Sequence, residues 1–169
     1  MKRVFAFIVV FCIWVSGCTA AKPAQPVTHS FCCTLTVTGD GQPFTGDLAV
    51  TADALTWRLA SPETVAGCVL VCDGEYVTVT PPDGSPLKVE AGKLPTDGAV
   101  AVLWNVLRTA DPTTIGWQNG DGALTGRVTG RVTGGQYLLL TDAVSGLPKS
   151  LRLTDGNWVA VFSAFENLS

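Results

Sequence analysis

Six Asp-Gly dipeptides punctuate this 169-residue sequence, at positions 40, 73, 83, 97, 121 and 155. Asp and Gly tolerate the positive φ angles of tight hairpin turns, so most of these dipeptides predict connections between neighbouring antiparallel strands. They also account for nearly half of the 14 acidic residues as turn formers rather than catalytic carboxylates. The sequence therefore favours a fold built from many short antiparallel strands.

The segments between these turns alternate between apolar and polar residues, as half-buried strands do. In SFCCTLTVT, residues 30–38, every odd position from Phe31 to Val37 is apolar and faces one side. About ten or eleven strands are predicted, and an antiparallel sheet of that size curls or closes. The segments are 30–38, 44–52, 54–60, CVLVCD, EYVTVT, TTIGWQ, ALTGRVTGRVTGGQ, YLLLTDA, KSLRLTD and NWVAVFSAFE.

One segment, residues 96–111, departs from this alternation and predicts an amphipathic helix. Thr96 or Asp97 can cap its start, and Asp111-Pro112 ends it. Such a helix needs an apolar surface to cover, which the sheet provides. The apolar residues that recur at helical spacing are Ala99, Val102, Leu103, Val106 and Leu107.

The N-terminus carries an export signal. Lys2 and Arg3 precede an uncharged apolar run at residues 4–15. This run is short of the roughly 20 residues that a membrane-spanning helix needs, but it suits the apolar region of a secretory signal. The sequence therefore predicts that the domain lies outside the cytoplasm.

Val15-Ser16-Gly17-Cys18 resembles the bacterial lipobox. The resemblance implies cleavage before Cys18 and lipid attached to its sulfur and new amino group, which is sufficient for stable membrane anchoring. We expect a lipoprotein signal peptide at 1–17, a lipidated tether at 18–29, a folded domain at 30–169, and a location on the extracytoplasmic face of the cell membrane. The alternatives are a secreted protein with a chance cysteine and a single-pass anchor that is never cut.

Charge argues against a nucleic-acid partner. Without Lys2 and Arg3 the chain keeps nine basic side chains against 14 acidic ones, a net charge of −5. The basic residues are scattered along the sequence, so no cluster for lipid headgroups is visible. In GRVTGRVTG, residues 126–134, Arg127 and Arg131 share one face of a predicted strand, and we favour a solvated face over an anion site.

Four cysteines, Cys32, Cys33, Cys68 and Cys72, remain for the folded domain. Cys68 and Cys72 in one strand would lie about 13 Å apart and could not bond each other. Cross-strand pairs of Cys33 with Cys68 or Cys72 remain allowed, and free thiols in the core are the alternative. The spacing CC…CxxxC lacks the paired CxxC of zinc sites, so no metal is predicted.

The sequence offers no catalytic residues. Its one histidine, His29, precedes the first strand, and neither a GxSxG nor an HExxH motif is present. A nucleophile needs a base beside it and a metal site needs convergent ligands, so we expect neither an enzyme nor a cofactor.

The C-terminal segment, residues 137–166, is YLLLTDAVSGLPKSLRLTDGNWVAVFSAFE. It resembles the last strands and the Gly-x-Pro turn of the half-barrel lipoprotein carriers LolA and LolB and of the mycobacterial LppX-type lipoproteins. SPETVAGCVLVCDGEYVTVT, residues 61–80, resembles uncharacterised lipoproteins of Gram-positive bacteria. The resemblance implies a mainly β (α+β) fold: an antiparallel curved half-barrel, or incomplete β-barrel, of about ten strands with one amphipathic helix on its concave face.

The resemblance also implies an apolar concavity that binds or carries a lipid or another hydrophobic ligand. The alternative is an envelope lipoprotein that interacts with proteins and whose helix fills the concavity, leaving no room for a ligand. The candidate cavity-lining residues are Leu48, Val50, Leu55, Trp57, Leu59, Leu103, Val106 and Leu107.

Overall fold

The computed structural model describes residues 28–110, 115–120 and 123–166. Within them, eleven strands form one antiparallel sheet in the order β6-β5-β4-β3-β2-β1-β11-β10-β9-β8-β7. The strands are β1 (Phe31–Thr38), β2 (Phe44–Val50), β3 (Leu55–Ser61), β4 (Val69–Cys72), β5 (Tyr76–Thr80), β6 (Leu87–Glu90), β7 (Ile115–Gly120), β8 (Ala123–Val132), β9 (Gly135–Asp142), β10 (Pro148–Leu153) and β11 (Val159–Glu166).

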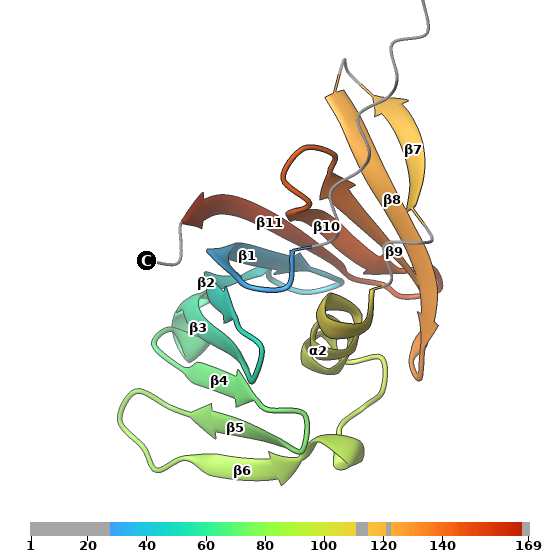
Figure 1. The fold of residues 1–169 in the computed structure, drawn as a ribbon. Helices are drawn as coiled ribbons and strands as arrows, with labels where there is room; N and C mark the ends of the chain where they lie inside the picture. The colour runs from blue at the N-terminus through green and yellow to red at the C-terminus, as the bar shows by residue number, and fades with distance from the viewer. Residues whose placement is uncertain (1–27, 111–114, 121–122, 167–169) are drawn as a thin grey trace, which may run out of the picture.

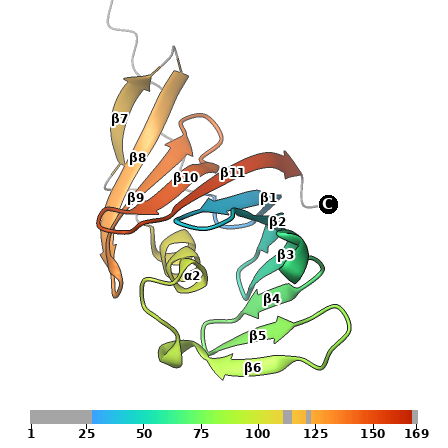
Figure 2. The ribbon, with the colours of Figure 1, turned by 180° about the vertical axis from the view of Figure 1, so that it is seen from behind.

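The sheet is open and strongly curved. Its first and last strands meet in the middle, because β1 pairs with β11 as well as with β2. The two halves on either side of this pair bend around the helix α2 (Ala99–Thr109), as Figures 1 and 2 show. β6 and β7 are the two edges of the sheet, which does not close. The predicted mainly β, curved half-barrel with a single helix is confirmed.

Strand alternation places the core on the concave face. Along β1 the odd-numbered residues from Phe31 to Val37 are buried, whereas the even-numbered ones are half-buried or exposed. The same alternation holds in β3, where Leu55, Trp57 and Leu59 are buried. Because side chains point to opposite faces at successive positions, each strand contributes one apolar row to a common core.

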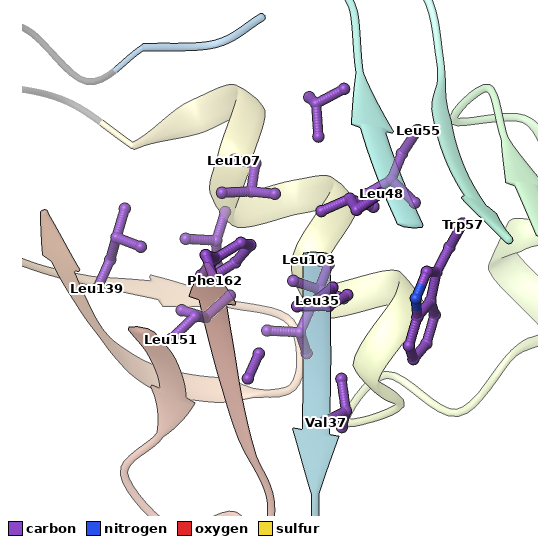
Figure 3. Close-up of a cluster of buried hydrophobic side chains, with 14 of the residues drawn as sticks. Leu35, Val37, Leu48, Leu55, Trp57, Leu103, Leu107, Leu139, Leu151 and Phe162 are labelled. Atoms are coloured by element: carbon purple, nitrogen blue, oxygen red, sulfur yellow. The ribbon is translucent and has the colours of Figure 1, made fainter. Parts of the chain in front are cut away.

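The helix covers part of this apolar face. Val102, Leu103, Val106 and Leu107 are fully buried. Figure 3 shows Leu103 and Leu107 among leucines of the central strands. Complete burial of each such side chain contributes roughly 1.5–3 kcal/mol before the entropy cost of ordering it. The helix is therefore a structural part of the core rather than a surface attachment.

Three details differ from the sequence prediction. The helix begins after Gly98 and has no side-chain cap, so neither Thr96 nor Asp97 caps it as expected. β6, an edge strand with mostly exposed residues, was not predicted because its alternation extends over only four residues, LKVE. Two 3₁₀ turns, Glu63–Val65 and Ala91–Lys93, were also not predicted. The helix stop at Asp111-Pro112 and the turn at Asp121-Gly122 lie outside the described residues.

Thr28 and His29, the last residues of the predicted tether, form hydrogen bonds with the folded domain. The Thr28 amide donates to the Gly146 carbonyl at 3.1 Å, and its hydroxyl donates to the Ser145 carbonyl at 2.9 Å. The His29 Nδ1 lies 2.5 Å from the Leu107 carbonyl oxygen at the end of α2. The chain preceding β1 is thus fixed both to the β9–β10 turn and to the helix.

The β9–β10 turn that receives Thr28 is itself held by Asp142. The backbone amide of Ser145, assisted by the Val144 amide and by Lys149, lowers the pKa of Asp142 to about 2. A carboxylate that accepts several hydrogen bonds is stabilised in its charged form. The turn consequently presents a fixed pair of carbonyls to the incoming chain.

The cysteine pairs that the sequence allowed are not formed, and all four described cysteines are free thiols. β2 and β3 lie between β1 and β4 in the sheet. Cys33 on β1 is therefore about 14 Å from the β4 positions, twice the Cα separation that a disulfide spans. Burial raises the pKa of Cys33 to about 12 and that of Cys72 above its usual value, so both stay protonated as small core residues.

The repeat GRVTGRVTG lies mainly in β8 and follows the expected alternation. Arg127, Thr129 and Arg131 are exposed, whereas Val128 is fully buried. Gly130 lies directly opposite Tyr137 of β9, and a Cβ atom at this position would stand 2.5 Å from the tyrosine hydroxyl oxygen. The absence of a side chain at Gly130 lets the Tyr137 ring lie over the strand.

We expect Gly130→Ala to destabilise the domain by about 1–3 kcal/mol, the cost of forcing a methyl group into a packed site. Chemical denaturation with urea measures this change. Gly41→Ala is the matched control, because no atom lies within 4 Å of its added Cβ. Equal stability of the two variants would contradict close packing of Tyr137 over Gly130.

Candidate functional site

The helix leaves part of the concave face uncovered, and an apolar cavity of about 620 Å³ lies there. It is enclosed by strands of the first half of the sheet, the β1–β2 turn and the first residues of α2. Its lining residues are Val37, Gly39, Asp40, Gly41, Gln42, Phe44, Trp57, Leu59, Leu70, Val77, Val79, Leu94, Pro95, Gly98, Ala99, Val100, Ala101 and Trp158.

Strand register builds the sheet side of the cavity. Trp57 of β3 lies opposite Leu70 of β4, which lies opposite Val79 of β5. Residues directly opposite in antiparallel strands point to the same face. This row of three apolar side chains therefore follows from the pairing of three consecutive strands.

Small residues build the helix side. Ala99, Val100 and Ala101 form the first turn of α2 and line the cavity. The bulky Leu103 and Leu107 come later along the helix and are fully buried against the sheet. The helix therefore fills the concave face along its C-terminal part and leaves space at its start.

Trp158 fixes the start of the helix and also lines the cavity. Its indole Nε1 donates to the backbone carbonyl of Asp97 at 2.9 Å. The Gly98 amide donates to the Pro95 carbonyl at 3.0 Å. These bonds to the segment before α2, rather than a capping side chain, position the small residues of its first turn.

Polar groups are few in the cavity wall. They come mainly from the β1–β2 turn, where Asp40 and Gln42 are exposed. The Asp40 carboxylate accepts a hydrogen bond from the Asn157 amide, which ties this turn to the one before β11. Asp40 is the one residue with a carboxylate side chain among those that line the cavity.

Trp57 adds a polar atom within the apolar wall. Its side chain is 4% exposed, and its indole Nε1 has no hydrogen-bond partner among the described residues. In Figure 3 Trp57 lies at the edge of the leucine cluster, on β3. An unpaired buried N–H group costs about 1–3 kcal/mol, so this position is not optimised for stability alone.

Two of the eight residues predicted to line the cavity, Trp57 and Leu59, do so. The structure places the other six in the closed core between the helix and the sheet. Leu70, Val77 and Val79 line the cavity but were not among the predicted residues. Val77 and Val79 alternate with threonines in β5, whereas β4, VLVC, is apolar throughout and indicates no inner face. The six core residues are Leu48, Val50, Leu55, Leu103, Val106 and Leu107.

A second cavity, of about 290 Å³, shares Val77, Leu94 and Ala101 with the first. Its wall carries more polar groups, among them Asn105 and Thr133. The two spaces are therefore neighbours on either side of these residues, beside the 3₁₀ turn at Ala91–Lys93 and the first turns of the helix. Together they offer an apolar compartment beside a mixed one.

The described residues contain no cluster of three or more His, Cys, Asp or Glu side chains that could hold a metal ion. Within the same part of the chain, no helix has the length and apolar character needed to cross a membrane. The arrangement that the structure does present is a concave apolar surface, which suits binding by burial of a hydrophobic group.

No protein family and no curated protein matches this sequence. Similar solved structures include an uncharacterised conserved protein from Thermus thermophilus, with a TM-score of 0.55 and 11% identity over 82% of this chain and 80% of that one. A LolA superfamily protein from Nitrosomonas europaea has a TM-score of 0.40 and 11% identity, over 82% of this chain and 84% of that one. At 11% identity, the likeness to the Thermus thermophilus structure is one of fold alone.

We expect Trp158→Phe to destabilise the domain by about 1–3 kcal/mol, because it removes the hydrogen bond to the Asp97 carbonyl and part of the packing. Asp97→Ala keeps that carbonyl and should change stability by less than about 0.5 kcal/mol. Urea denaturation of both variants tests this contrast. A larger loss in Asp97→Ala would show that its carboxylate caps the helix after all.

Proposed function

We propose that this protein is a membrane-anchored extracytoplasmic lipoprotein that binds a lipid acyl chain or another hydrophobic ligand in the cavity beside α2. The observation that carries the proposal is the apolar space of about 620 Å³ that the helix leaves open. Ligand sites in proteins occupy about 300–1,000 Å³ and are mostly apolar with a few polar groups. This cavity has both properties.

The division of the concave face favours ligand binding over the alternative in which the helix fills the core. The large residues of α2 are fully buried, which accounts for stability. Its first turn presents Ala99 and Ala101 to the cavity, where larger apolar residues would have closed the space. A core selected for packing alone avoids such voids.

The polar character of the second cavity supports an amphipathic ligand. An acyl chain would occupy the larger apolar space, and a polar headgroup would lie near Asn105 and Thr133. Binding rather than catalysis is proposed because the lining of the larger cavity supplies one carboxylate, Asp40, which already accepts a bond from Asn157.

The membrane anchor is proposed from the sequence, since Cys18 lies outside the described residues. The lipobox Val15-Ser16-Gly17-Cys18 supports it. With lipid on Cys18, the nine residues 19–27 would link the lipidated cysteine to Thr28, where the chain joins the folded domain. No protein partner is assigned.

We expect co-purified lipid when the chain from residue 18 onward, carrying Cys18→Ser, is expressed in bacteria and examined by native mass spectrometry. This chain contains all eleven strands, α2 and the core. A hydrophobic naphthylamine dye added to delipidated protein should bind with increased fluorescence. Val79→Phe enlarges a side chain in the cavity wall, and the steric cost of about 1–3 kcal/mol should weaken dye binding roughly tenfold or more.

Val71→Phe is the matched control. Val71 pairs with Thr56 and Thr78, so it lies on the face of the sheet opposite to Val79. The same added volume at this position should leave dye binding unchanged. An apo mass in repeated preparations, together with equal dye affinity in the two variants, would contradict a ligand in the cavity.

We expect Cys18→Ser in the full-length chain to abolish lipid attachment. Metabolic labelling with a radioactive fatty acid should mark the wild-type protein and not the variant. The wild type should remain with membranes after a high-salt wash, because covalent acyl chains partition into the bilayer. Labelling that persists in the variant would show that the lipobox interpretation is wrong.

A further inference from the structure

Three arginines that are scattered in the sequence gather on the outer face of the sheet. Arg127 and Arg131 lie on β8, Arg152 lies on β10, and β9 runs between them. All three are exposed. Strand pairing therefore creates a basic cluster that the spacing along the chain does not reveal.

The strand register shows how the cluster is arranged. Arg131 lies opposite Gln136 of β9, and Leu138 lies opposite both Thr129 and Arg152. These side chains share one face of the sheet. Together with the third arginine of the cluster they line a groove of about 500 Å³ on that face. Besides the arginines, the lining includes the hydroxyl group of Thr129, the amide group of Gln136 and the apolar Leu138.

None of the three arginines forms an ion pair with a described carboxylate; Asp142, on the same face of β9, is paired with Lys149. The ion pairs among the described residues are Lys93–Glu90 and Lys149–Asp142, so none of the three guanidinium groups has a described carboxylate within 4 Å. The whole chain has a net charge of −3, yet three of its described arginines share this face. The three arginines therefore make this face positively charged, although the chain as a whole carries a net negative charge.

Exposed aliphatic side chains border the arginines. Val159 of β11 lies opposite Arg152 and is 38% exposed, and Val161 lies opposite Ser150 and is 44% exposed. Leu140 lies opposite both Arg127 and Ser150 and is half-buried. Guanidinium groups beside exposed aliphatic residues are typical of surfaces that lie at a membrane interface.

We propose that this outer face of β8, β9, β10 and β11, the arginine face, docks onto the anionic phospholipid headgroups of a membrane. Arginine presents several donors in a planar fork that matches phosphate geometry. The bordering valines contact the headgroup region, and the charge complementarity sets the orientation of an otherwise acidic domain on an anionic surface.

The place where the chain enters the domain agrees with this orientation. Thr28 is bonded to the β9–β10 turn, at the end of the strand that carries Leu140. With the proposed anchor at Cys18, the nine intervening residues make ten Cα-to-Cα steps and span at most about 36 Å, which holds the domain near the bilayer. The apolar cavity lies on the opposite, concave face of the sheet, so docking leaves it uncovered.

The test uses the unlipidated chain from residue 18 onward with Cys18→Ser, in flotation with vesicles. We expect binding to phosphatidylcholine vesicles that contain about one third phosphatidylglycerol, and much weaker binding to phosphatidylcholine alone. Each arginine near such a surface contributes about a fivefold gain, so the triple variant Arg127→Gln, Arg131→Gln, Arg152→Gln should lose binding about a hundredfold. Added salt should weaken the wild-type interaction.

The matched control is the triple variant Arg58→Gln, Lys88→Gln, Lys93→Gln, which has the same net charge and an intact arginine face. It should bind anionic vesicles like the wild type. Equal loss in both triple variants, or no preference of the wild type for anionic vesicles, would overturn the proposal. Wild-type binding to an anionic polymer such as heparin, without vesicle binding, would overturn it in favour of a macromolecular partner.

This experiment is independent of the proposed anchor and ligand. The chain carries no acyl group, so vesicle binding does not depend on Cys18. The naphthylamine dye reports on the cavity, and its binding should be the same in the arginine-face variant as in the wild type. Loss of dye binding together with a lower thermal midpoint would show that the triple variant has a folding defect. In that case the three single Arg→Gln variants are compared, provided that each keeps the thermal midpoint of the wild type. Unchanged vesicle binding in all three would overturn the proposal.

Discussion

The contact between α2 and the concave face determines both the stability and the shape of this protein. An open sheet with one apolar face cannot be stable in water until that face is covered. Four residues of the helix, from Val102 to Leu107, are buried completely in that contact. A helix of 11 residues is too short to cover the concave face of a sheet of 11 strands, so part of that face stays uncovered. The cavity is that remainder.

The pairing of β1 with β11 is what allows one helix to contact both halves of the sheet. It brings the first and last strands to the centre, so that Leu35 of β1 and Phe162 of β11 are neighbours in the register. Both side chains are buried beneath α2, as Figure 3 shows. His29 adds a bond from the chain entering β1 to the last turn of the helix. The helix is therefore held by the first and the last strands of the sheet together.

The architecture could be predicted because its signals are local. Alternation along 30–38 and 54–60 indicated which residues of β1 and β3 face the core, and helical spacing indicated the buried face of α2. β6 was missed because its alternation of apolar and charged residues, LKVE, extends over only four residues. The predicted helix cap was wrong because α2 begins at Ala99, which places Gly98, a residue without a side chain, at the cap position.

The cavity and the arginine face could not be located from local patterns. Periodicity indicates which face of the sheet a residue occupies, but not how far along that face the helix extends. Leu55 and Leu59, for example, lie on the same face of β3, but of these two only Leu59 lines the cavity. In the same way, the alternation of β8 placed Arg127 and Arg131 outward without showing that Arg152 would join them across β9. Both features arise from strand register, which is a property of the assembled sheet.

The two candidate surfaces occupy different halves and opposite faces of one sheet. The cavity belongs to the concave side of β1 to β5, and the arginine face belongs to the outer side of β8 to β11. Membrane docking and ligand exchange make opposing demands on the domain. If the domain docked with its concave side against the membrane, the bilayer would block the entrance of the cavity. Because successive side chains of a strand point to opposite faces, a single sheet can satisfy both demands without further elements.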